Sequence, residues 1–222
     1  MNKHTGIYIP GRLSSERLPR KLVLPMSDAC LFEIACRKLN ELPKDINKYT
    51  LVYDKELVDI AGRYENIIVI HRSRESAKAE GPLSYIFEGM KMASDTHLMF
   101  LNPCLAFLSQ ETILKSIKAF NDSEADYATS VKPFQNWLIG KDGKVLNEMN
   151  YKELTTKKIE PVWQAAHCFH IFNREQFFQD GYMLKDGFLP LPVPVEETID
   201  VDTMEEYEYA RWKYETDLRN RY

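Results

Sequence analysis

The stretch Ile9–Lys21, IPGRLSSERLPRK, carries residue types suited to binding an anion. It holds four cations and only one carboxylate, although the whole chain has a formal net charge of −4. Backbone N–H groups in a loop between a strand and a helix can surround phosphate groups, and cationic side chains add charge-assisted hydrogen bonds. The stretch is therefore a candidate phosphate loop; the alternative is a solvated loop whose cations pair with acidic neighbours.

A pair of carboxylates near the other end of the sequence suits a divalent cation. In the stretch ETIDVDTMEE, Asp200 and Asp202 alternate along an extended segment, so their side chains point to the same side. Two such carboxylates repel each other, and Mg²⁺ relieves that repulsion because it prefers carboxylate oxygens together with waters and phosphates. The alternative is that Asp202 helps to cap the final helix while Asp200 is an ordinary surface residue.

The two stretches are more informative together than apart. A polyphosphate nucleotide needs cations on its oxygens and a divalent metal at the reacting phosphorus. The patterns GxxxxGK[ST] and GxGxxG are absent from the sequence, which excludes a P-loop and a standard dinucleotide fingerprint. The residues thus indicate a nucleotide site of another kind.

Alternating strands and helices decide where these residues meet. Runs rich in β-branched and aromatic residues have strand length, at 6–10, 49–54, 66–72, 97–103 and 127–133. Helical patterns with an apolar stripe begin near Pro82, Ser109 and Thr203, the last with a Thr-x-x-Glu capping box. This order predicts an α/β fold with a mainly parallel sheet and helices on both faces. Ligands bind such sheets beyond the carboxyl ends of the strands, where the loop after the first strand lies.

Residues 134–164 interrupt this alternation. The Asp-Gly pair in WLIGKDGKVLN predicts a β-hairpin, and a strand-like run, AAHCFHIF, follows at 165–172. The alternating prolines of LPLPVPVEE, at 189–197, exclude a central strand. We therefore predict a single domain over 1–222, with 134–164 as an excursion that is a candidate dimerisation arm.

Composition narrows the class of protein. The chain has 222 residues, of which 44% are hydrophobic and 28% charged, as expected of a soluble domain with a sizeable core. A pI near 5.8 argues against general affinity for nucleic acid. No apolar stretch approaches the roughly 18 residues of a membrane span, and the N-terminal residues do not resemble a signal peptide. We expect a cytoplasmic protein without a membrane partner.

The cysteines and histidines do not indicate a disulfide, a catalytic thiol or a metal site. The four cysteines form no CxxC pair, which predicts free, buried thiols, and Cys104 has no basic partner indicated by the sequence. His167 and His170 stand at odd spacing in a predicted strand. We therefore expect their rings on opposite faces of the sheet rather than on one metal ion.

Several motifs resemble those of one family, in the family's order. IPGRLSSERLPRK resembles the opening IPARxxSxRLPGK signature of the CMP-sugar synthetases, the acylneuraminate and 3-deoxy-manno-octulosonate cytidylyltransferases. LVYDKELVDIAGRY resembles their second strand and helix, and HRSRESA their R-P-x-x-x-A nucleotide segment. HLMFLNPCLAFLSQETI is similar to the stretch that carries QPTSP in acylneuraminate enzymes, and ETIDVDTMEEYEYA resembles the terminal IDIDTxEDxxxA. The resemblance spans nearly the whole chain.

This resemblance implies a fold, a reaction and partners. The fold would be a Rossmann-like nucleotide-sugar transferase domain that forms a homodimer through an extension matching 134–164. The enzyme would be a Mg²⁺-dependent cytidylyltransferase that joins CTP to an acidic sugar, or to a related carboxylate or phosphonate acceptor, and releases pyrophosphate. The CMP-activated product would serve surface polysaccharide biosynthesis.

The resemblance also implies roles for individual residues. Arg12 and Lys21 would hold the triphosphate and act in catalysis, and Asp200 and Asp202 would hold Mg²⁺. Asn102 and Gln164 would face the acceptor. The nucleotide would be bound by Gly11, Arg12, Ser14, Ser15, Arg17, Lys21 and Arg72.

Two positions depart from the family pattern. Arg20 replaces the glycine expected before Lys21, which makes the loop bulkier and more cationic. Asn102 stands near the position of an acidic residue in the octulosonate enzymes and cannot supply its charge. The acceptor pocket is therefore not obviously that of either enzyme.

Two other functions stay open on the sequence. A GT-A-type glycosyltransferase with a nucleotide-sugar donor also uses a D-x-D pair, although typically in mid-chain rather than before the last helix. A catalytically degenerate nucleotide-binding or partner protein would bind CTP, or nothing, without turnover.

Overall fold

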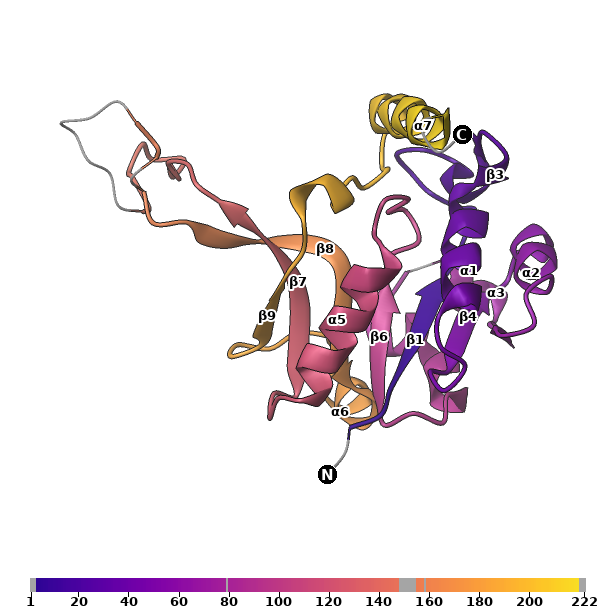
Figure 1. Ribbon diagram of the computed structural model, residues 1–222. Helices are drawn as coiled ribbons and strands as arrows, with labels where there is room; N and C mark the ends of the chain where they lie inside the picture. The colour runs from indigo at the N-terminus through magenta and orange to yellow at the C-terminus, as the bar shows by residue number, and fades with distance from the viewer. Residues whose placement is uncertain (1–2, 79, 148–154, 158, 220–222) are drawn as a thin grey trace.

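A twisted sheet forms the centre of the molecule (Figure 1). The computed structural model describes residues 3–78, 80–147, 155–157 and 159–219. Within these ranges a seven-stranded sheet has the order β5-β4-β1-β6-β8-β7-β9. Its strands are β1 (Thr5–Pro10), β4 (Lys48–Val52), β5 (Ile68–His71), β6 (His97–Leu101), β7 (Tyr127–Phe134), β8 (Val162–Asn173) and β9 (Leu189–Pro192). Only β8 is antiparallel to its neighbours, so the predicted mainly parallel α/β sheet is confirmed.

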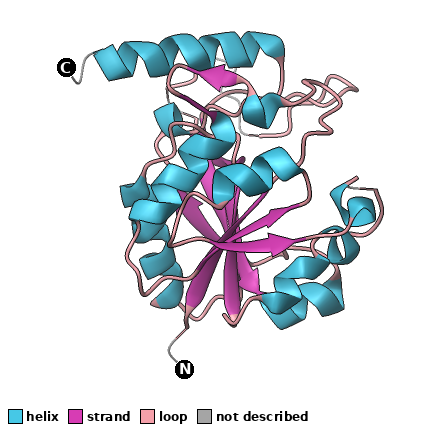
Figure 2. Cartoon of the chain, turned by 90° about the vertical axis from the view of Figure 1, so that its right-hand side faces the viewer, coloured by secondary structure: helices cyan, strands magenta, loops and turns pink. Residues whose placement is uncertain are grey.

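Helices cover both faces of this sheet (Figure 2). One face packs against α1 (Leu31–Glu41), α2 (Lys55–Ala61) and α5 (Gln110–Asn121), and the other against α4 (Leu83–Ile86), the 3₁₀ turn η2 (Glu88–Met92) and α6 (Arg174–Asp180). The remaining elements are short, apart from the last helix: η1 (Lys21–Val23), β2 (Pro25–Met26), β3 (Ala29–Cys30), α3 (Arg74–Ala77), η3 (Val195–Glu197) and α7 (Met204–Arg219). None of the helices in the described ranges is both long and apolar enough to cross a membrane. All four cysteines are free and buried, as predicted.

All three predicted helices begin where the sequence places them, and two have the predicted side-chain caps. The Ser109 hydroxyl accepts the Thr112 N–H at 3.1 Å, and Glu206 accepts the Thr203 N–H at 2.8 Å in the capping box. The third helix, after Pro82, is shorter than its apolar pattern predicts, because it ends at Ile86 and continues as a 3₁₀ turn. Gly89 in that turn lies so close to Leu51 of β4 that a Cβ atom would overlap the leucine side chain.

A bulge in β8 changes the expected orientation of two histidines. The β7–β8 register shifts between Thr129 and Val131, and His167 has a left-handed φ of 53°. As a result, the His167 and His170 rings meet edge to face with their centroids 6.3 Å apart. The expectation that odd spacing puts them on opposite faces is wrong, because the bulge breaks the alternation of the strand.

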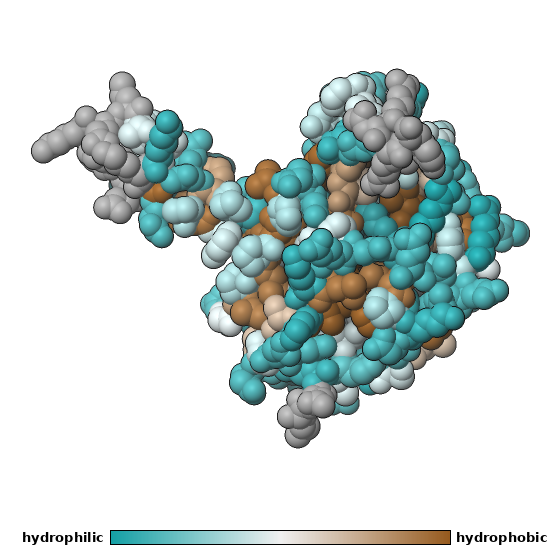
Figure 3. Space-filling model, in the orientation of Figure 1, coloured by the Kyte–Doolittle hydropathy of each residue, from teal (hydrophilic) through white to brown (hydrophobic). Residues whose placement is uncertain are grey.

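The described residues of the predicted excursion, 134–147, 155–157 and 159–164, stand away from the body as an arm (Figures 1 and 3). β7 and β8 extend into it, and an isolated antiparallel bridge joins Ile139 to Val145, with Gly143 at a φ of 80° in the predicted hairpin turn. Several large apolar side chains of the arm and its base are exposed: Ile139, Leu146, Val162 and Trp163. Residues 148–154 and 158 of the predicted excursion lie outside the described ranges.

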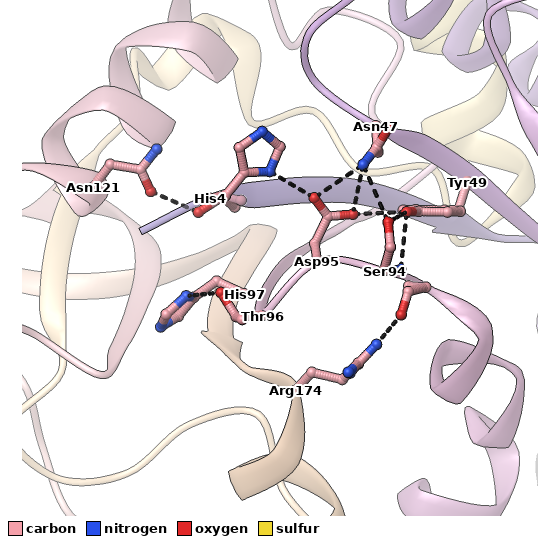
Figure 4. Close-up of polar contacts among 11 residues, drawn as sticks. His4, Asn47, Tyr49, Ser94, Asp95, Thr96, His97, Asn121 and Arg174 are labelled. Atoms are coloured by element: carbon pink, nitrogen blue, oxygen red, sulfur yellow. Dashed lines mark hydrogen bonds and ion pairs between the residues drawn. The ribbon is translucent and has the colours of Figure 1, made fainter. Parts of the chain in front are cut away.

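A buried carboxylate joins three strands at the amino-terminal edge of the sheet (Figure 4). Asp95, only 3% exposed, precedes β6 and accepts hydrogen bonds from Tyr49 at 2.7 Å and Asn47 at 3.2 Å. Its other contact is His4, whose Nδ1 lies 2.8 Å from the carboxylate. Gly6 of β1 runs directly beneath, where a Cβ would overlap the carboxylate. This network fixes β1, β4 and β6 at the edge opposite their carboxyl ends.

The Asp95 network makes a stability prediction. Asp95→Ala should lower the free energy of unfolding by about 2–4 kcal/mol, because Tyr49 and Asn47 lose a buried hydrogen-bond acceptor. The matched control is Asp59→Ala, which removes a solvent-exposed ion pair with Lys55 on α2 and should change stability by less than about 0.5 kcal/mol. Urea denaturation of both variants measures this, and equal losses would contradict a structural role specific to Asp95.

Candidate functional site

A cavity of about 580 Å³ opens at the carboxyl edge of the parallel strands. Its walls come from the loop after β1, the ends of β5 and β6, α4 and the segment before α7. Four cationic side chains and two carboxylates line it: Arg12, Arg17, Lys21, Arg72, Glu16 and Asp202. Of the predicted site residues, Gly11, Ser15 and Asn102 line it as well. The first and last motifs of the chain thus meet in one cavity, at the position that the strand order predicts.

The carboxylate of Asp202 binds two cations of the opening loop. Its Oδ1 lies 2.6 Å from the Lys21 ammonium, and its Oδ2 lies 2.7 Å from the Arg17 guanidinium. The Lys21 ammonium also donates to the Val201 carbonyl at 2.9 Å. Burial alone would lower the pKa of Lys21, but Cys104 and Asp202 together raise it above the ordinary lysine value. Lys21 is therefore a cation fixed in position.

Asp200 lies behind this pair and has one oxygen free. Asn102 donates to Asp200 Oδ2 at 3.1 Å, and its own Oδ1 accepts the Cys104 N–H at 3.0 Å. The buried Asp200 Oδ1 atom has no hydrogen-bond partner within the described part of the chain. Burial and the charge of Asp202 raise the pKa of Asp200. Burial likewise raises the pKa of Cys104 to about 12, so it is the buried, protonated thiol that we predicted.

This arrangement fits Mg²⁺ bound partly by a substrate. In the described residues no three His, Cys, Asp or Glu side chains form a closed metal site. Mg²⁺ is ordinarily held by one or two carboxylates plus substrate phosphates and waters. The free oxygen of Asp200 beside Asp202 supplies such a pair, and a cation there relieves the repulsion that raises the pKa of Asp200.

Arg72 reaches the cavity from the end of β5 and is 7% exposed. Its Nη2 donates to the Gly11 carbonyl at 2.7 Å, whereas its Nε has no partner among the described atoms. Burial and the charge of Arg12 lower the pKa of Arg72 to about 10. A buried N–H donor without an acceptor is a binding position for a polar ligand atom.

An apolar wall faces these charges, and sequence reasoning missed it. It consists of Leu83, Ile86, Phe87 and Phe100. The apolar stripe after Pro82 was visible in the sequence. Such a stripe indicates only that this face of the helix is covered, and it does not show whether the protein core or a ligand covers it. Within the cavity, these residues give a flat ligand group an apolar surface to pack on.

Three predicted site residues do not line this cavity. Asp200 is separated from it by Asn102, and Ser14 is exposed on the opening loop. Gln164 is exposed on β8, paired with Lys132 of β7 towards the arm. Their roles stay predictions.

Arg20 has the backbone conformation that explains the family's glycine. Its φ of 60° lies in the left-handed region, where glycine is favoured because other residues are strained by their Cβ. Its guanidinium turns away from the cavity and lies 2.6 Å from Glu56 on α2. The extra charge relative to the family pattern is therefore paired with a neighbouring helix.

Several solved structures superpose on almost the entire chain. One is CMP:2-keto-3-deoxy-manno-octonic acid synthetase complexed with CTP, with a TM-score of 0.68 and 12% identity, covering 97% of this chain and 100% of that one. Another is 4-diphosphocytidyl-2C-methyl-D-erythritol synthase from Anaerococcus prevotii, with a TM-score of 0.67 and 16% identity over 96% and 97% of the two chains. A third is a cytidylyltransferase from Leptospira borgpetersenii, with a TM-score of 0.61 and 15% identity over 94% and 85%.

The chain has the cytidylyltransferase fold. The resemblance seen in the motifs therefore extends to the three-dimensional structure, and the predicted fold is confirmed. No protein-family model matches the sequence, and no curated protein matches it. At these identities the likeness concerns the fold and not the reaction.

Arg20 allows a test of the strained loop of this cytidylyltransferase fold. Arg20→Gly should leave the free energy of unfolding unchanged or raise it by up to about 1 kcal/mol, because relief of the left-handed strain offsets the lost surface pair. Arg20→Val should lower it by about 1–2 kcal/mol, because a β-branched residue resists this conformation. Thermal unfolding compares both with Glu56→Ala, which removes the ion pair alone. If all three variants lose the same free energy of unfolding, the ion pair with Glu56 outweighs the backbone strain at Arg20.

Proposed function

We propose that this protein is a cytidylyltransferase that joins CTP to an acidic sugar, or to a related carboxylate or phosphonate acceptor. The acceptor hydroxyl oxygen forms a bond to the α-phosphorus of CTP while the bond from that phosphorus to the β-phosphate oxygen breaks. Pyrophosphate leaves, the hydroxyl proton passes to solvent, and a CMP-activated product remains. The observation that carries this proposal is the meeting of four cations and Asp202 at one cavity of a cytidylyltransferase fold, with Asp200 hydrogen-bonded to the lining residue Asn102.

The opening loop supplies the charge for the triphosphate. Arg12 and Lys21 bind phosphate oxygens, and Lys21 stabilises the negative charge that develops on departing pyrophosphate. Arg17 adds a third cation from the same loop. Catalysis in this scheme rests on positioning and electrostatics, since phosphoryl-type transfers need little covalent chemistry from the protein.

The nucleoside lies between Arg72 and the apolar wall. The free Nε–H of Arg72 donates to a carbonyl of the base or a hydroxyl of the ribose, while Phe87 and Phe100 face the flat ring. Backbone groups next to Gly11 complete the recognition of cytosine. Exclusion of water by the wall strengthens these hydrogen bonds.

Asp200 and Asp202 would hold Mg²⁺ through their carboxylate oxygens. When bound, Mg²⁺ neutralises charge at the reacting phosphate. Asn102 orients Asp200 through its hydrogen bond and faces the acceptor together with Gln164. The arm joins two copies into a homodimer, and the product serves surface polysaccharide synthesis in the cytoplasm.

Thermal unfolding with CTP, UTP, ATP and GTP, each with and without Mg²⁺, tests the nucleotide site first. A nucleotide that binds the native state raises the midpoint of unfolding by mass action. At a nucleotide concentration 100 times Kd, the free energy of unfolding increases by about 2.7 kcal/mol. CTP should give the largest shift, and Mg²⁺ should increase it. Pyrophosphate release from CTP over a panel of acidic acceptors then identifies the second substrate.

Two outcomes would reject the proposal. A shift specific to UDP- or GDP-sugars, without pyrophosphate release from CTP, would favour the glycosyltransferase. A CTP shift without turnover on any acceptor, or no shift at all, would favour the degenerate binding protein.

The Asp202 ion pairs make a prediction about metal dependence. Without Mg²⁺, CTP must displace the Asp202 carboxylate from Lys21 and Arg17. The phosphates of CTP then lie beside that carboxylate, which has lost its cations and repels them. Asp202→Asn should therefore bind CTP about tenfold more tightly than the wild type in EDTA, and it should lose the increase in affinity that Mg²⁺ gives. Isothermal titration calorimetry with and without Mg²⁺ measures both effects.

Lys21→Ala is the control for this prediction, since it removes a cation and leaves the carboxylate. It should weaken CTP binding in both conditions and lower turnover strongly while the fold stays intact. Asp202→Asn could instead bind CTP more weakly than the wild type without Mg²⁺, as Lys21→Ala does. That result would mean that the Asp202 carboxylate organises the loop rather than competing with phosphate.

A further inference from the structure

Lys38 of α1 lies outside the cavity, yet it contacts the loop that carries Asn102. Its ammonium donates to the carbonyl of Leu105 at 3.0 Å and to that of Ala106 at 2.6 Å. Both residues belong to the turn that follows β6 and precedes α5, and both are buried. A loop with buried carbonyls needs donors, because an unpaired buried carbonyl is costly.

This loop is connected to the carboxylate segment by a second set of contacts. The Cys104 carbonyl accepts the Val201 N–H at 3.3 Å, and Asn102 binds both Cys104 and Asp200 through its side chain. Val201 stands between Asp200 and Asp202. A shift of the loop would therefore move Asn102 and both carboxylates relative to the cations of the opening loop.

The side chains of Leu105 and Ala106 pack in the hydrophobic core, but few other hydrogen bonds hold the middle of this loop in the described structure. The Ser109 N–H donates to Glu197 at 2.9 Å at its far end, and the Asn102 N–H donates to the Cys168 carbonyl at 2.9 Å at its near end. Among the described atoms, the Leu105 and Ala106 carbonyls are bound by the Lys38 side chain.

We propose that Lys38 is a positioning residue: its ammonium fixes the loop 102–108 through two backbone carbonyls and so sets the place of Asn102, Asp200 and Asp202. The inference rests on the proposed function for its kinetic consequences, whereas its structural part stands independently. Lys38 touches neither the cavity nor the expected positions of the substrates.

Protons can reach this ammonium from a second cavity of about 490 Å³, on the outer side of the loop. Burial lowers the pKa of Lys38 to about 7, and the nearby Glu197 opposes that effect. The charge is therefore present below about pH 7 and lost above it, which weakens both hydrogen bonds because charge-assisted bonds are stronger. The titratable groups around it come from α1, α7, η3 and β8: Arg37, Glu41, Lys213, Tyr214, Asp217, Glu196, Glu197 and Cys168.

Hydrogen–deuterium exchange tests the structural part without any substrate. Lys38→Met keeps the length of the side chain but removes the donor, and it should speed exchange at Cys104, Leu105 and Val201 about tenfold or more. Lys115→Met on the exposed surface of α5 is the matched control and should leave these amides unchanged. Unchanged exchange in a folded Lys38→Met protein would overturn the proposal.

Steady-state kinetics tests the positioning role. Lys38→Met should lower kcat about tenfold and raise the Mg²⁺ concentration for half-maximal rate, while KM for CTP stays within about twofold, since Arg12, Lys21 and Arg72 lie on other elements. Lys38→Arg should restore much of kcat, because a guanidinium also offers paired donors, and its rate should not fall above pH 7 as that of the wild type does. A purely structural role would instead reduce the amount of folded protein and leave kcat per folded molecule and the pH profile unchanged.

The two tests separate the possible failures. A wild-type protein that releases no pyrophosphate from CTP would reject the proposed function, and the exchange experiment would still decide on Lys38. An active enzyme whose Lys38→Met variant keeps the wild-type kcat, Mg²⁺ dependence and pH profile would reject the positioning role alone.

Discussion

The organisation of the cavity depends on one carboxylate that binds two cations. Asp202 lies within 2.7 Å of both Arg17 and Lys21, which are separated from it by about 180 residues in the sequence. Without this negative charge, the cations of the opening loop would repel one another at the mouth of the cavity. The same contact fixes where the segment before α7 crosses the sheet edge. These two ion pairs thus join the chain's first and last motifs at one cavity.

The two edges of the sheet differ in how completely their polar groups are paired. At the amino-terminal edge, Asp95 is bound by side chains from three directions and holds the strands in register. At the carboxyl edge, Asp200 Oδ1 and Arg72 Nε are buried without partners in the described structure. Buried polar atoms are ordinarily paired, and unpaired ones cluster where a ligand or ion completes the bonding. The Asp95 carboxylate thus has its hydrogen-bond partners within the chain, whereas Asp200 and Arg72 at the carboxyl edge each keep an atom available to a ligand.

Sequence reasoning predicted most of the fold because local patterns and sheet topology agree. The five predicted strands, the Ser109 cap and the Thr203 capping box all follow from residue type and spacing. It failed where tertiary contacts override local preference. The bulge at His167 coincides with a shift in the pairing with β7, and the helix after Pro82 gives way to a 3₁₀ turn in which Gly89 lies against Leu51 of β4.

Prediction of the candidate site was also uneven. The charged residues could be chosen because charge at the carboxyl end of a strand has few purely structural uses. The apolar wall and the position of Lys38 could not be chosen, because leucine, phenylalanine and lysine on helices have the same pattern in proteins without any ligand. Only the three-dimensional structure shows that Phe87 faces a cavity and that Lys38 reaches across to another loop.

The prolines of β9 have a consequence for how copies of the protein can associate. The Val193 N–H donates to Val131 of β7, so Leu189 and Leu191 direct their backbone groups to the same side, and Pro190 and Pro192 face outwards. Proline has no N–H, so a strand arriving at this free edge finds carbonyl groups but no donors at those two positions. A neighbouring strand is therefore poorly paired at β9, and this edge of the sheet is disfavoured as a place for another copy to add a strand.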